Sequence, residues 1–245
     1  MTNTAVIVGP GRLGRTVATA LQQAGWSITL VARGTLIPPA PITWLTVPDR
    51  AIADVARVTP PGGVILHASG ATDITPLRPH RPAGSLHPLM TFPGPEIAIP
   101  PMADLPAAVA GDPAAQEAAR HLSAAMGWHP FSVPGDRALY HAAAVLAGNY
   151  ATTLLGIAAE ALSAAGVPAA DAPALLAPLA LASLRNAARV GPARALTGPA
   201  IRGDTPIIEQ HITALQQAAP ELADVYVTLL NATVRMLGDQ DPGLK

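Results

Sequence analysis

The sequence predicts an α/β protein in which an N-terminal parallel sheet precedes an all-helical C-terminal domain. Short apolar segments alternate with helical patterns up to residue 134, and such alternation is typical of parallel strands joined by helices. From residue 135 onward, only helical patterns occur. Half of the 245 residues are apolar and 13% are charged, a balance that favours a folded chain with a sizeable core. We therefore expect two domains, 1–134 and 135–245.

The first three elements form a strand–helix–strand unit. An apolar run over Thr4–Val8 ends in glycine and is typical of a buried strand. Apolar residues at helical spacing follow over 12–24, and Gly25 ends this helix. A second apolar run predicts a strand over Ser27–Val31. Two strands joined by one helix within about thirty residues indicate a parallel βαβ unit.

The connection to the third strand is short, so the sheet is abridged after the second strand. Only residues 34–41 separate Arg33 from Ile42, and Pro38, Pro39 and Pro41 lie among them. A helical crossover needs a dozen residues or more, and proline would break it. Eight extended residues at ~3.3 Å each reach roughly 26 Å, enough to return along a strand of about 20 Å. We therefore expect an extended crossover here.

Further elements are expected in both domains. The first domain should hold strands at 42–47, 63–67, 83–86, 107–110 and 129–133, helices at 50–58 and 113–126, and a proline-rich loop at 91–106. The second should hold helices at 137–165, 169–188, 205–218 and 221–237. The apolar stretch 142–165 is interrupted by Asn149, Thr152, Thr153 and Glu160. We therefore expect a buried helix there and not a membrane span.

Composition and charge argue against several classes of partner. The formal net charge is −1 and no basic stripe is present, so we expect no nucleic-acid partner. The chain contains no cysteine, which excludes disulfides and thiolate nucleophiles and fits a reducing compartment. The N-terminal segment lacks the basic region and cleavage site of a signal peptide. We expect a cytoplasmic protein without a membrane partner.

A glycine-rich motif lies between the first strand and the first helix. It matches G-x-G-x-x-G and consists of Gly9, Pro10, Gly11, Arg12, Leu13 and Gly14. The glycines permit a tight turn and close approach to a pyrophosphate, while the helix N-terminus supplies unpaired N–H groups and partial positive charge. In this βαβ context the motif predicts a Rossmann-like dinucleotide site. The alternative is a tight turn without a ligand.

The residue type at the end of the second strand bears on cofactor choice. NAD-binding folds place an acidic residue there to hold the ribose 2′-OH, whereas this chain has Arg33. A guanidinium pairs well with a 2′-phosphate. We therefore expect NADP, with NAD the less favoured cofactor. The alternative is a solvated arginine in a loop.

Six segments resemble a known family. They are VGPGRLG at 8–14, TVPDRAIADVA at 46–56, ILHASGA at 65–71, GSLHPLMTF at 84–92, YHAAAVLAGNY at 140–150 and LTGPAIRGD at 196–204. The chain resembles a family of proteins assigned as NADP-dependent oxidoreductases, which joins a Rossmann-like domain to the domain of unknown function 2520. That family belongs to the 6-phosphogluconate dehydrogenase-like group, which includes pyrroline-5-carboxylate reductase.

The resemblance implies where the site lies. Pro48, with Asp49 after it, should lie near the cofactor, and Ser69 and Gly70 should lie where a nicotinamide ring is expected. His87 should follow a third strand, where it would donate a proton or orient a substrate oxygen; the alternative is a structural loop histidine. Family members usually carry a helix and a strand where this chain has residues 34–41, so one wall of the adenosine site is missing here.

The helix that begins near residue 137 carries further candidates. Its residues Tyr140, His141 and Asn149 would line a cleft with the substrate. At 100° per residue, His141 and Asn149 differ by about 80° and lie roughly 12 Å apart along the axis. Related dehydrogenases use a lysine donor on this helix, but Lys245 is the chain's one lysine. His141 is therefore our candidate general acid, and the alternative is a histidine packed at the domain interface.

Arg202 follows a break between the later helices, and it is a candidate ligand for a substrate carboxylate. Asp204 fits better as the N-cap of the next helix. His67 and His80 are expected to be structural. No set of histidine and acidic residues has metal-ligand spacing, and no G-x-S-x-G motif indicates a hydrolase.

The leading hypothesis is a reductase that transfers a hydride between NADP(H) and a small carbonyl or imine substrate, with His141 or His87 as the proton donor. The alternative is a non-catalytic dinucleotide-binding or sensing protein on the same scaffold. The apolar content of residues 137–237 also predicts a homodimer through the C-terminal helices.

Overall fold

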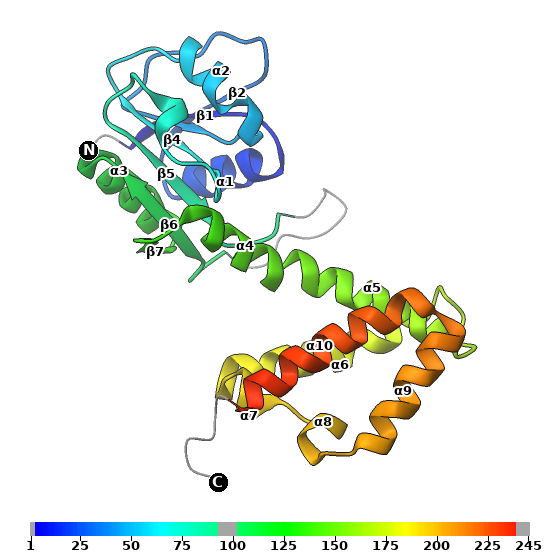
Figure 1. Cartoon of the computed structure of the whole chain (residues 1–245). Coiled ribbons are helices and arrows are strands. Elements are labelled where there is room, and N and C mark those ends of the chain that lie inside the picture. The colour runs from blue at the N-terminus through cyan, green and yellow to red at the C-terminus, as the bar shows by residue number, and fades with distance from the viewer. Residues whose placement is uncertain (1–2, 93–101, 239–245) are drawn as a thin grey trace. The chain divides into compact units, whose positions relative to one another are not determined.

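The computed structural model describes residues 3–92 and 102–238 and divides into two compact units, Met1–Gly148 and Asn149–Lys245. The first unit holds the sheet, and the second contains helices (Figure 1). Helix α4 (Arg137–Ala147) groups with the sheet in the first unit, and the predicted domain boundary at residue 134 stays a prediction. Residues 93–101 of the expected loop at 91–106 lie outside the described residues.

The sheet has seven strands in the order β2-β1-β3-β4-β5-β6-β7. Their bounds are β1 Thr4–Val8, β2 Ser27–Val31, β3 Ile42–Leu45, β4 Val64–His67, β5 Ala83–Pro88, β6 Pro106–Gly111 and β7 His129–Ser132. The first five strands along the chain are parallel to one another, as predicted. Strand β6 is antiparallel to β5, and β7 is parallel to β6. The predicted parallel sheet therefore has one antiparallel pair, β5 with β6.

Helices cover both faces of the sheet. On one face, α1 (Arg12–Gln23) and α3 (Pro113–Ala125) pack on a core cluster that includes Trp44 and Leu86. On the other face, α2 (Ile52–Val58) contributes to a second buried cluster. Burial on both faces explains why the central strands are continuous apolar runs in the sequence.

The extended connection after β2 is confirmed. Residues 34–41 contain no helix or strand, and β3 pairs in parallel with β1. Ile37 is 5% exposed and belongs to the second core cluster. One buried side chain therefore anchors this short crossover against the sheet.

The helix expected at 137–165 is divided. Gly148 separates α4 from α5 (Asn149–Ala164), and its φ of −103° and ψ of −68° depart from regular helix. The remaining helices are α6 Ala172–Val190, α7 Pro192–Ala195, α8 Pro199–Arg202, α9 Thr205–Ala218 and α10 Pro220–Gly238. The short α7 and α8 were not predicted. Asp204 occupies the N-cap position of α9, but its side chain makes no capping hydrogen bond.

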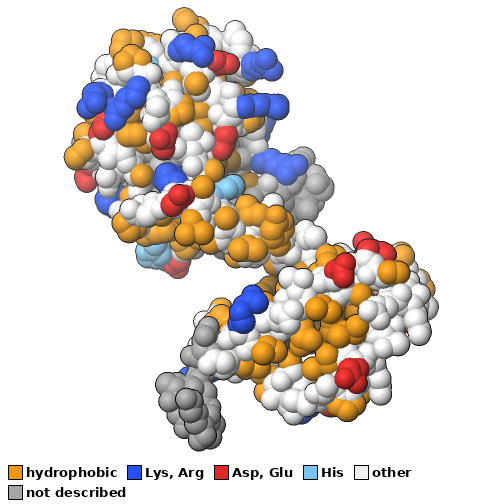
Figure 2. All heavy atoms as spheres, in the orientation of Figure 1, with side chains coloured by type: hydrophobic (Ala, Val, Ile, Leu, Met, Phe, Trp, Pro, Cys, Tyr) orange, Lys and Arg blue, Asp and Glu red, His pale blue; other side chains and the backbone are white. Residues whose placement is uncertain are grey.

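The second unit buries few side chains within the chain itself. Among its described residues, the buried ones are Ala159, Ala172, Ala219, Leu222 and Ala223. Hydrophobic side chains gather on its visible face (Figure 2). The expected buried helix at 142–165 is wrong for a single chain, because only Ala159 is buried there. By length and composition, Arg137–Ala164 is the one described helical stretch that could cross a membrane, so the absence of a membrane partner stays a prediction.

Candidate functional site

The glycine-rich loop between β1 and α1 has the geometry of a phosphate cradle. Gly9 has a φ of +108°, and a Cβ there would lie 2.7 Å from the Thr46 carbonyl oxygen. A Cβ on Gly14 would collide with the Gly9 carbonyl oxygen. A Cβ on Gly11 would meet no atom within 4 Å. The outer two glycines are therefore needed for packing, whereas the middle one leaves open space for a ligand.

Thr46 holds this loop in place. Its side-chain Oγ1 donates hydrogen bonds to the carbonyl oxygens of Val8 and Gly9, at 3.0 and 2.9 Å. Helix α1 begins after Gly11 without a side-chain cap, so its first-turn N–H groups are free to bind an anion. Thr46 was not among the predicted site residues, although it begins the segment at 46–56 that carries part of the family resemblance.

The other predicted cofactor residues of the loop differ in exposure. Arg12 is exposed, and Arg15 Nε donates to the Pro10 carbonyl oxygen at 2.8 Å. Leu13 packs against the core of the first unit. Arg33 is exposed in the turn after β2. The loop as described therefore fits a dinucleotide pyrophosphate, while the NADP preference rests on Arg33 alone.

The loops after β3 and β4 are tied together by hydrogen bonds. Asp49 follows Pro48, and its Oδ2 accepts hydrogen bonds from Ser69 Oγ at 2.6 Å and from Thr72 Oγ1 at 3.2 Å. Ser69 Oγ in turn accepts from the Thr72 backbone N–H at 2.9 Å. Because β3 and β4 are parallel neighbours, these contacts lie at the carboxyl edge of the sheet, where open α/β sheets bind ligands.

Helix α4 clamps the β4 loop from its other side. Arg137 Nη2 donates to the Ser69 carbonyl oxygen at 2.8 Å, and its Nε donates to the Thr72 carbonyl oxygen at 3.1 Å. Asp136 caps the helix by accepting from the backbone N–H groups of Ala138 and Leu139. Arg137 was not among the predicted site residues, because no motif or spacing in the sequence connects it to residues 69–72.

Two predicted histidines meet at Gly70. A Cβ at Gly70 would lie 2.7 Å from His141 Cδ2 and 2.9 Å from His87 Nε2. The centroids of the two imidazole rings are 6.1 Å apart. His87 comes from the end of β5 and His141 from α4. Residue 70 must therefore be small for both rings to reach this position.

Tyr140 completes this group. Its hydroxyl lies 2.8 Å from His87 Nδ1, and the two rings meet edge to face with centroids 5.6 Å apart. Phe131 packs against the other side of Tyr140, with a centroid distance of 6.1 Å. The structure thus brings together three predicted residues, His87, Tyr140 and His141, from separate elements.

Burial sets the protonation states of this group. Burial, together with the nearby His141 and Arg137, lowers the pKa of His87 to about 4. Burial raises the pKa of Tyr140, while the charge of Arg137 opposes that rise. At neutral pH, His87 is therefore a neutral imidazole and Tyr140 a neutral phenol. His87 can donate one N–H hydrogen bond, but it is not an imidazolium.

His67 lies under the same loop and is held by the backbone. The Ser69 N–H donates to His67 Nδ1 at 3.1 Å, so the ring proton is on Nε2, which donates to the Asp73 carbonyl oxygen at 3.0 Å. Burial lowers the pKa of His67 to about 4. His80 Nε2 is similarly bonded to the Ala56 carbonyl oxygen. Both contacts agree with structural roles for these histidines.

The family is decided by the C-terminal part of the chain. Residues 105–233 match the model of a family described as a domain of unknown function (DUF2520), and this segment is more than half of the 245 residues. The chain belongs to the DUF2520 family. The resemblance stated from the sequence motifs is thereby confirmed. A search of curated proteins gave no match.

Solved structures show the fold of this DUF2520 protein. A Bacteroides fragilis protein provisionally assigned as an NADP oxidoreductase has a TM-score of 0.77 and 20% identity, over 96% of this chain and 98% of that chain. A Thermotoga maritima protein has the same TM-score and identity, over 96% and 99%. A 1-pyrroline-5-carboxylate reductase from Streptococcus pyogenes has a TM-score of 0.64 and 15% identity, over 97% and 100%. The predicted fold class is confirmed.

Two predicted site residues of the DUF2520 chain lie in the second unit. Asn149 is the first residue of α5, and Arg202 ends α8 and is exposed. Their roles toward substrate stay predictions. Within the described residues, no group of three histidine or acidic side chains could hold a metal ion.

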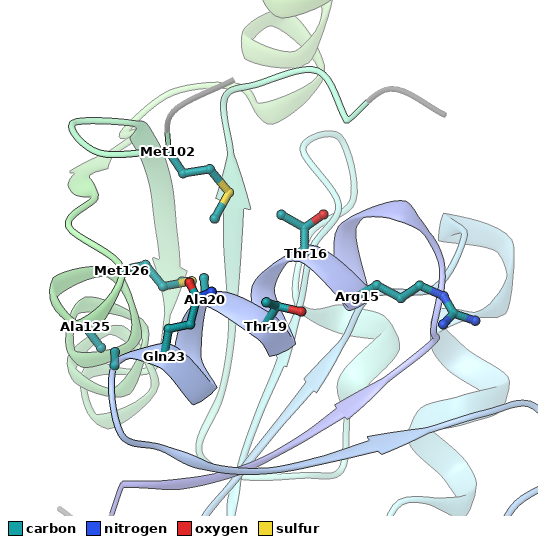
Figure 3. A pocket seen from close by; sticks show the side chains of 9 residues that line it. Arg15, Thr16, Thr19, Ala20, Gln23, Met102, Ala125 and Met126 are labelled. Atoms are coloured by element: carbon teal, nitrogen blue, oxygen red, sulfur yellow. The ribbon is translucent and has the colours of Figure 1, made fainter. Parts of the chain in front are cut away.

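A hollow of about 690 Å³ lies away from the histidine group. It is lined by α1 and the end of α3, with Met102 between them (Figure 3). Its one charged lining residue, Arg15, already bonds the Pro10 carbonyl oxygen. The hollow contains none of the predicted site residues, so it does not define the site.

The two low histidine pKa values predict a pH-dependent stability of the first unit. His67 and His87 have an ordinary pKa of 6.5 when unfolded and about 4 when folded. Between pH 6.5 and pH 4, these two histidines bind more protons in the unfolded chain than in the folded chain. The free energy of unfolding therefore falls as the pH is lowered from 6.5 to 4, and below pH 4 these histidines cause no further fall. Urea titration should show this, because all three tryptophans, Trp26, Trp44 and Trp128, lie in the first unit.

The variant His87→Gln should reduce the steepness of this fall. The matched control is His129→Gln, since the His129 side chain is 70% exposed and should leave the pH dependence unchanged. An unfolding free energy with the same pH dependence in His87→Gln and in the wild type would contradict the proposed burial of neutral His87.

Proposed function

We propose that this protein is an oxidoreductase that transfers a hydride between NADP(H) and a small carbonyl or imine substrate. One observation carries the proposal: the open Gly11 cradle follows β1, and His87, at the end of the parallel strand β5, meets Tyr140 and His141 of α4 beside Gly70. A dinucleotide whose pyrophosphate lies on the glycine loop extends along this edge toward its nicotinamide end. The reductase names of structural neighbours, such as the Streptococcus pyogenes enzyme, support it.

Several residues of the chain would hold the cofactor. The N–H groups at the start of α1 would bind the pyrophosphate, and Arg33 would bind the 2′-phosphate. Pro48, Ser69 and Gly70 would border the nicotinamide end. When bound, the reduced nicotinamide supplies the hydride.

The remaining predicted site residues would act on the substrate. His141 or His87 would give the proton to the substrate heteroatom, within hydrogen-bond reach of the Gly70 surface. Tyr140, Asn149 and Arg202 would orient the substrate, with Arg202 suited to a carboxylate. The protein would thus provide orientation and electrostatics for a small molecule.

One specific observation favours a second candidate function. Residues 34–41 contain no helix or strand, so the wall that family members usually build beside the adenosine is missing. A non-catalytic dinucleotide-binding or sensing protein would tolerate this loss of contacts better than an enzyme that depends on NADP(H). NADPH oxidation in the presence of small oxo acids, imines or aldehydes distinguishes the two.

The cofactor site predicts different effects at two positions. Gly11→Val should abolish binding of NADPH and NADH without unfolding the chain, because Gly11 has a φ of −72° and its Cβ direction is free of protein atoms. Arg33→Ala should weaken NADPH by about 10- to 100-fold, from the loss of charge-assisted hydrogen bonds, and leave NADH nearly unchanged. Isothermal titration calorimetry measures the affinity of each variant for NADPH and for NADH.

The control for charge is Arg57→Ala, because Arg57 is exposed and paired only with Asp54 on α2. It should leave both affinities unchanged. Wild-type NADPH affinity in Gly11→Val would contradict the cofactor site, and equal losses for both cofactors in Arg33→Ala would contradict the 2′-phosphate role.

We also propose that a second copy of this chain covers the apolar faces of the helical unit. Sixteen large hydrophobic residues are exposed in the described chain, and ten of them lie in the second unit, from Tyr150 to Met236. Leu179 and Leu184, both on α6, are 67% and 56% exposed. Apolar helix surface on this scale is typical of an interaction surface, and an isologous dimer would bury it symmetrically.

Light scattering at low micromolar concentration tests the dimer. We expect twice the 24.9 kDa mass of the chain. Changing Leu179 and Leu184 together to lysine should shift the mass toward monomer, because two buried charges oppose association. The control Leu36→Lys, at an 86% exposed position of the first unit, should remain dimeric. A wild-type monomer, or recovery of the protein in the membrane fraction, would contradict the proposal.

A further inference from the structure

We propose that Tyr140 and His87 form a proton relay, in which His87 Nε2 delivers the proton beside Gly70 and Tyr140 replaces it through Nδ1. This inference rests on the proposed function, and it selects His87 over His141 as the proton donor. It also gives Tyr140 a role beyond substrate contact. The hydrogen bond between the two side chains and the unpartnered His87 Nε2 beside Gly70 carry the argument.

The first step of the argument is the contact between Tyr140 and His87. The 2.8 Å separation of the hydroxyl oxygen and Nδ1 is a good hydrogen-bond distance. The edge-to-face ring arrangement at 89° places the hydroxyl at the edge of the imidazole. Phe131 packs on Tyr140, which limits the motion of the phenol ring. The pair is therefore held in a fixed geometry before any ligand binds.

The second step is the direction of that hydrogen bond. Arg137 precedes Tyr140 by three residues on α4, so the two side chains share one helix face. A nearby positive charge makes a phenol a stronger hydrogen-bond donor and a weaker acceptor. Tyr140 should therefore donate to His87 Nδ1, and this bond fixes the ring proton on Nε2.

The third step is what lies around Nε2. A Cβ at residue 70 would stand 2.9 Å from this nitrogen and 2.7 Å from His141 Cδ2, so Nε2 lies close to the Gly70 backbone and the His141 ring. Among the described residues, Nε2 has no hydrogen-bond partner, whereas both ring nitrogens of His67 are bonded. The His87 N–H is thus left without a protein acceptor, and in the proposed relay the substrate oxygen or nitrogen would accept from it.

His141 is less suited to this task. Its Cδ2 carbon is the atom that faces Gly70, and its ring nitrogens have no hydrogen bond among the described residues. No neighbouring group therefore fixes its tautomer or replaces a proton that it gives away. Its ring instead packs edge to face against His87 at 6.1 Å and would help to position it.

The proton steps balance without a net change of charge in the chain. When a carbonyl carbon gains a hydride, its oxygen takes the proton from Nε2, so the O–H bond forms as the N–H bond breaks. Nδ1 takes the Tyr140 hydroxyl proton at the same time, and the tyrosinate then regains a proton from water. An alkoxide is close in basicity to hydroxide and is far more basic than a phenolate, so it can deprotonate a phenol.

Arg137 stabilises the intermediate charge. Burial raises the pKa of Tyr140, and the guanidinium opposes this rise. The transient tyrosinate would therefore face a cation that is already fixed by the Ser69 and Thr72 carbonyl oxygens. Tyr140 is half-buried, so water can reach it to complete the cycle.

The tautomer of His87 tests the relay directly. Long-range 1H–15N NMR of histidine-labelled protein at neutral pH distinguishes the two tautomers, and His87→Gln assigns the resonances. We expect the Nε2–H form in the wild type and a mixture of both forms in Tyr140→Phe. The matched control is Tyr226→Phe, since Tyr226 makes a similar contact with His211 Nδ1 at 3.0 Å in an exposed position. That variant should alter His211 and leave His87 unchanged.

Turnover provides the second readout. Tyr140→Phe should lower the rate on a verified carbonyl substrate by ~10²-fold or more, with NADPH affinity by calorimetry within twofold of the wild type. An Nδ1–H tautomer in the wild type, an unchanged tautomer in Tyr140→Phe, or unchanged turnover would each overturn the relay. Failure of the wild type to bind NADPH would instead contradict the proposed function, so the two failures are distinguishable.

Discussion

The contact between Gly70 and the two imidazole rings is the constraint on which the site depends. The backbone at Gly70 approaches His87 and His141 so closely that a methyl group would not fit. Hydrogen bonds from opposite sides hold the loop at this position: Asp49 accepts from Ser69 and Thr72 side chains, and Arg137 donates to their carbonyl oxygens. A loop fixed in this way can present a nicotinamide surface and a proton donor in one geometry.

Local patterns in the sequence predicted much of the fold. The bounds of β1 and β2 were predicted to the residue, because each is a short apolar run bounded by turn signals. The extended crossover at 34–41 followed from chain length and proline content. The antiparallel β6 was not predicted, since an apolar run does not carry strand direction. The break at Gly148 was missed because an isolated glycine is compatible with a helix.

The site was predictable in part. Motif context predicted the glycine loop, and the family resemblance pointed to Ser69, Gly70 and His87 and to the helix that carries Tyr140 and His141. The hydrogen bond between His87 and Tyr140 joins residues 53 positions apart, so no local pattern could reveal it. Thr46 and Arg137 act on backbone carbonyl oxygens, and such contacts leave no sequence signature. The burial of α5 was mispredicted because an apolar helix needs neighbours on all sides to be buried, and one chain does not provide them.

The variant Gly70→Ala tests the central claim most directly. The added methyl group meets two imidazole rings and not backbone, so the chain should fold with both rings displaced from residue 70. The account predicts shifted ring resonances for both His87 and His141 by NMR, with His67 unchanged, and a loss of turnover. Wild-type ring resonances for both histidines in Gly70→Ala would contradict it, because the rings would then not meet at residue 70.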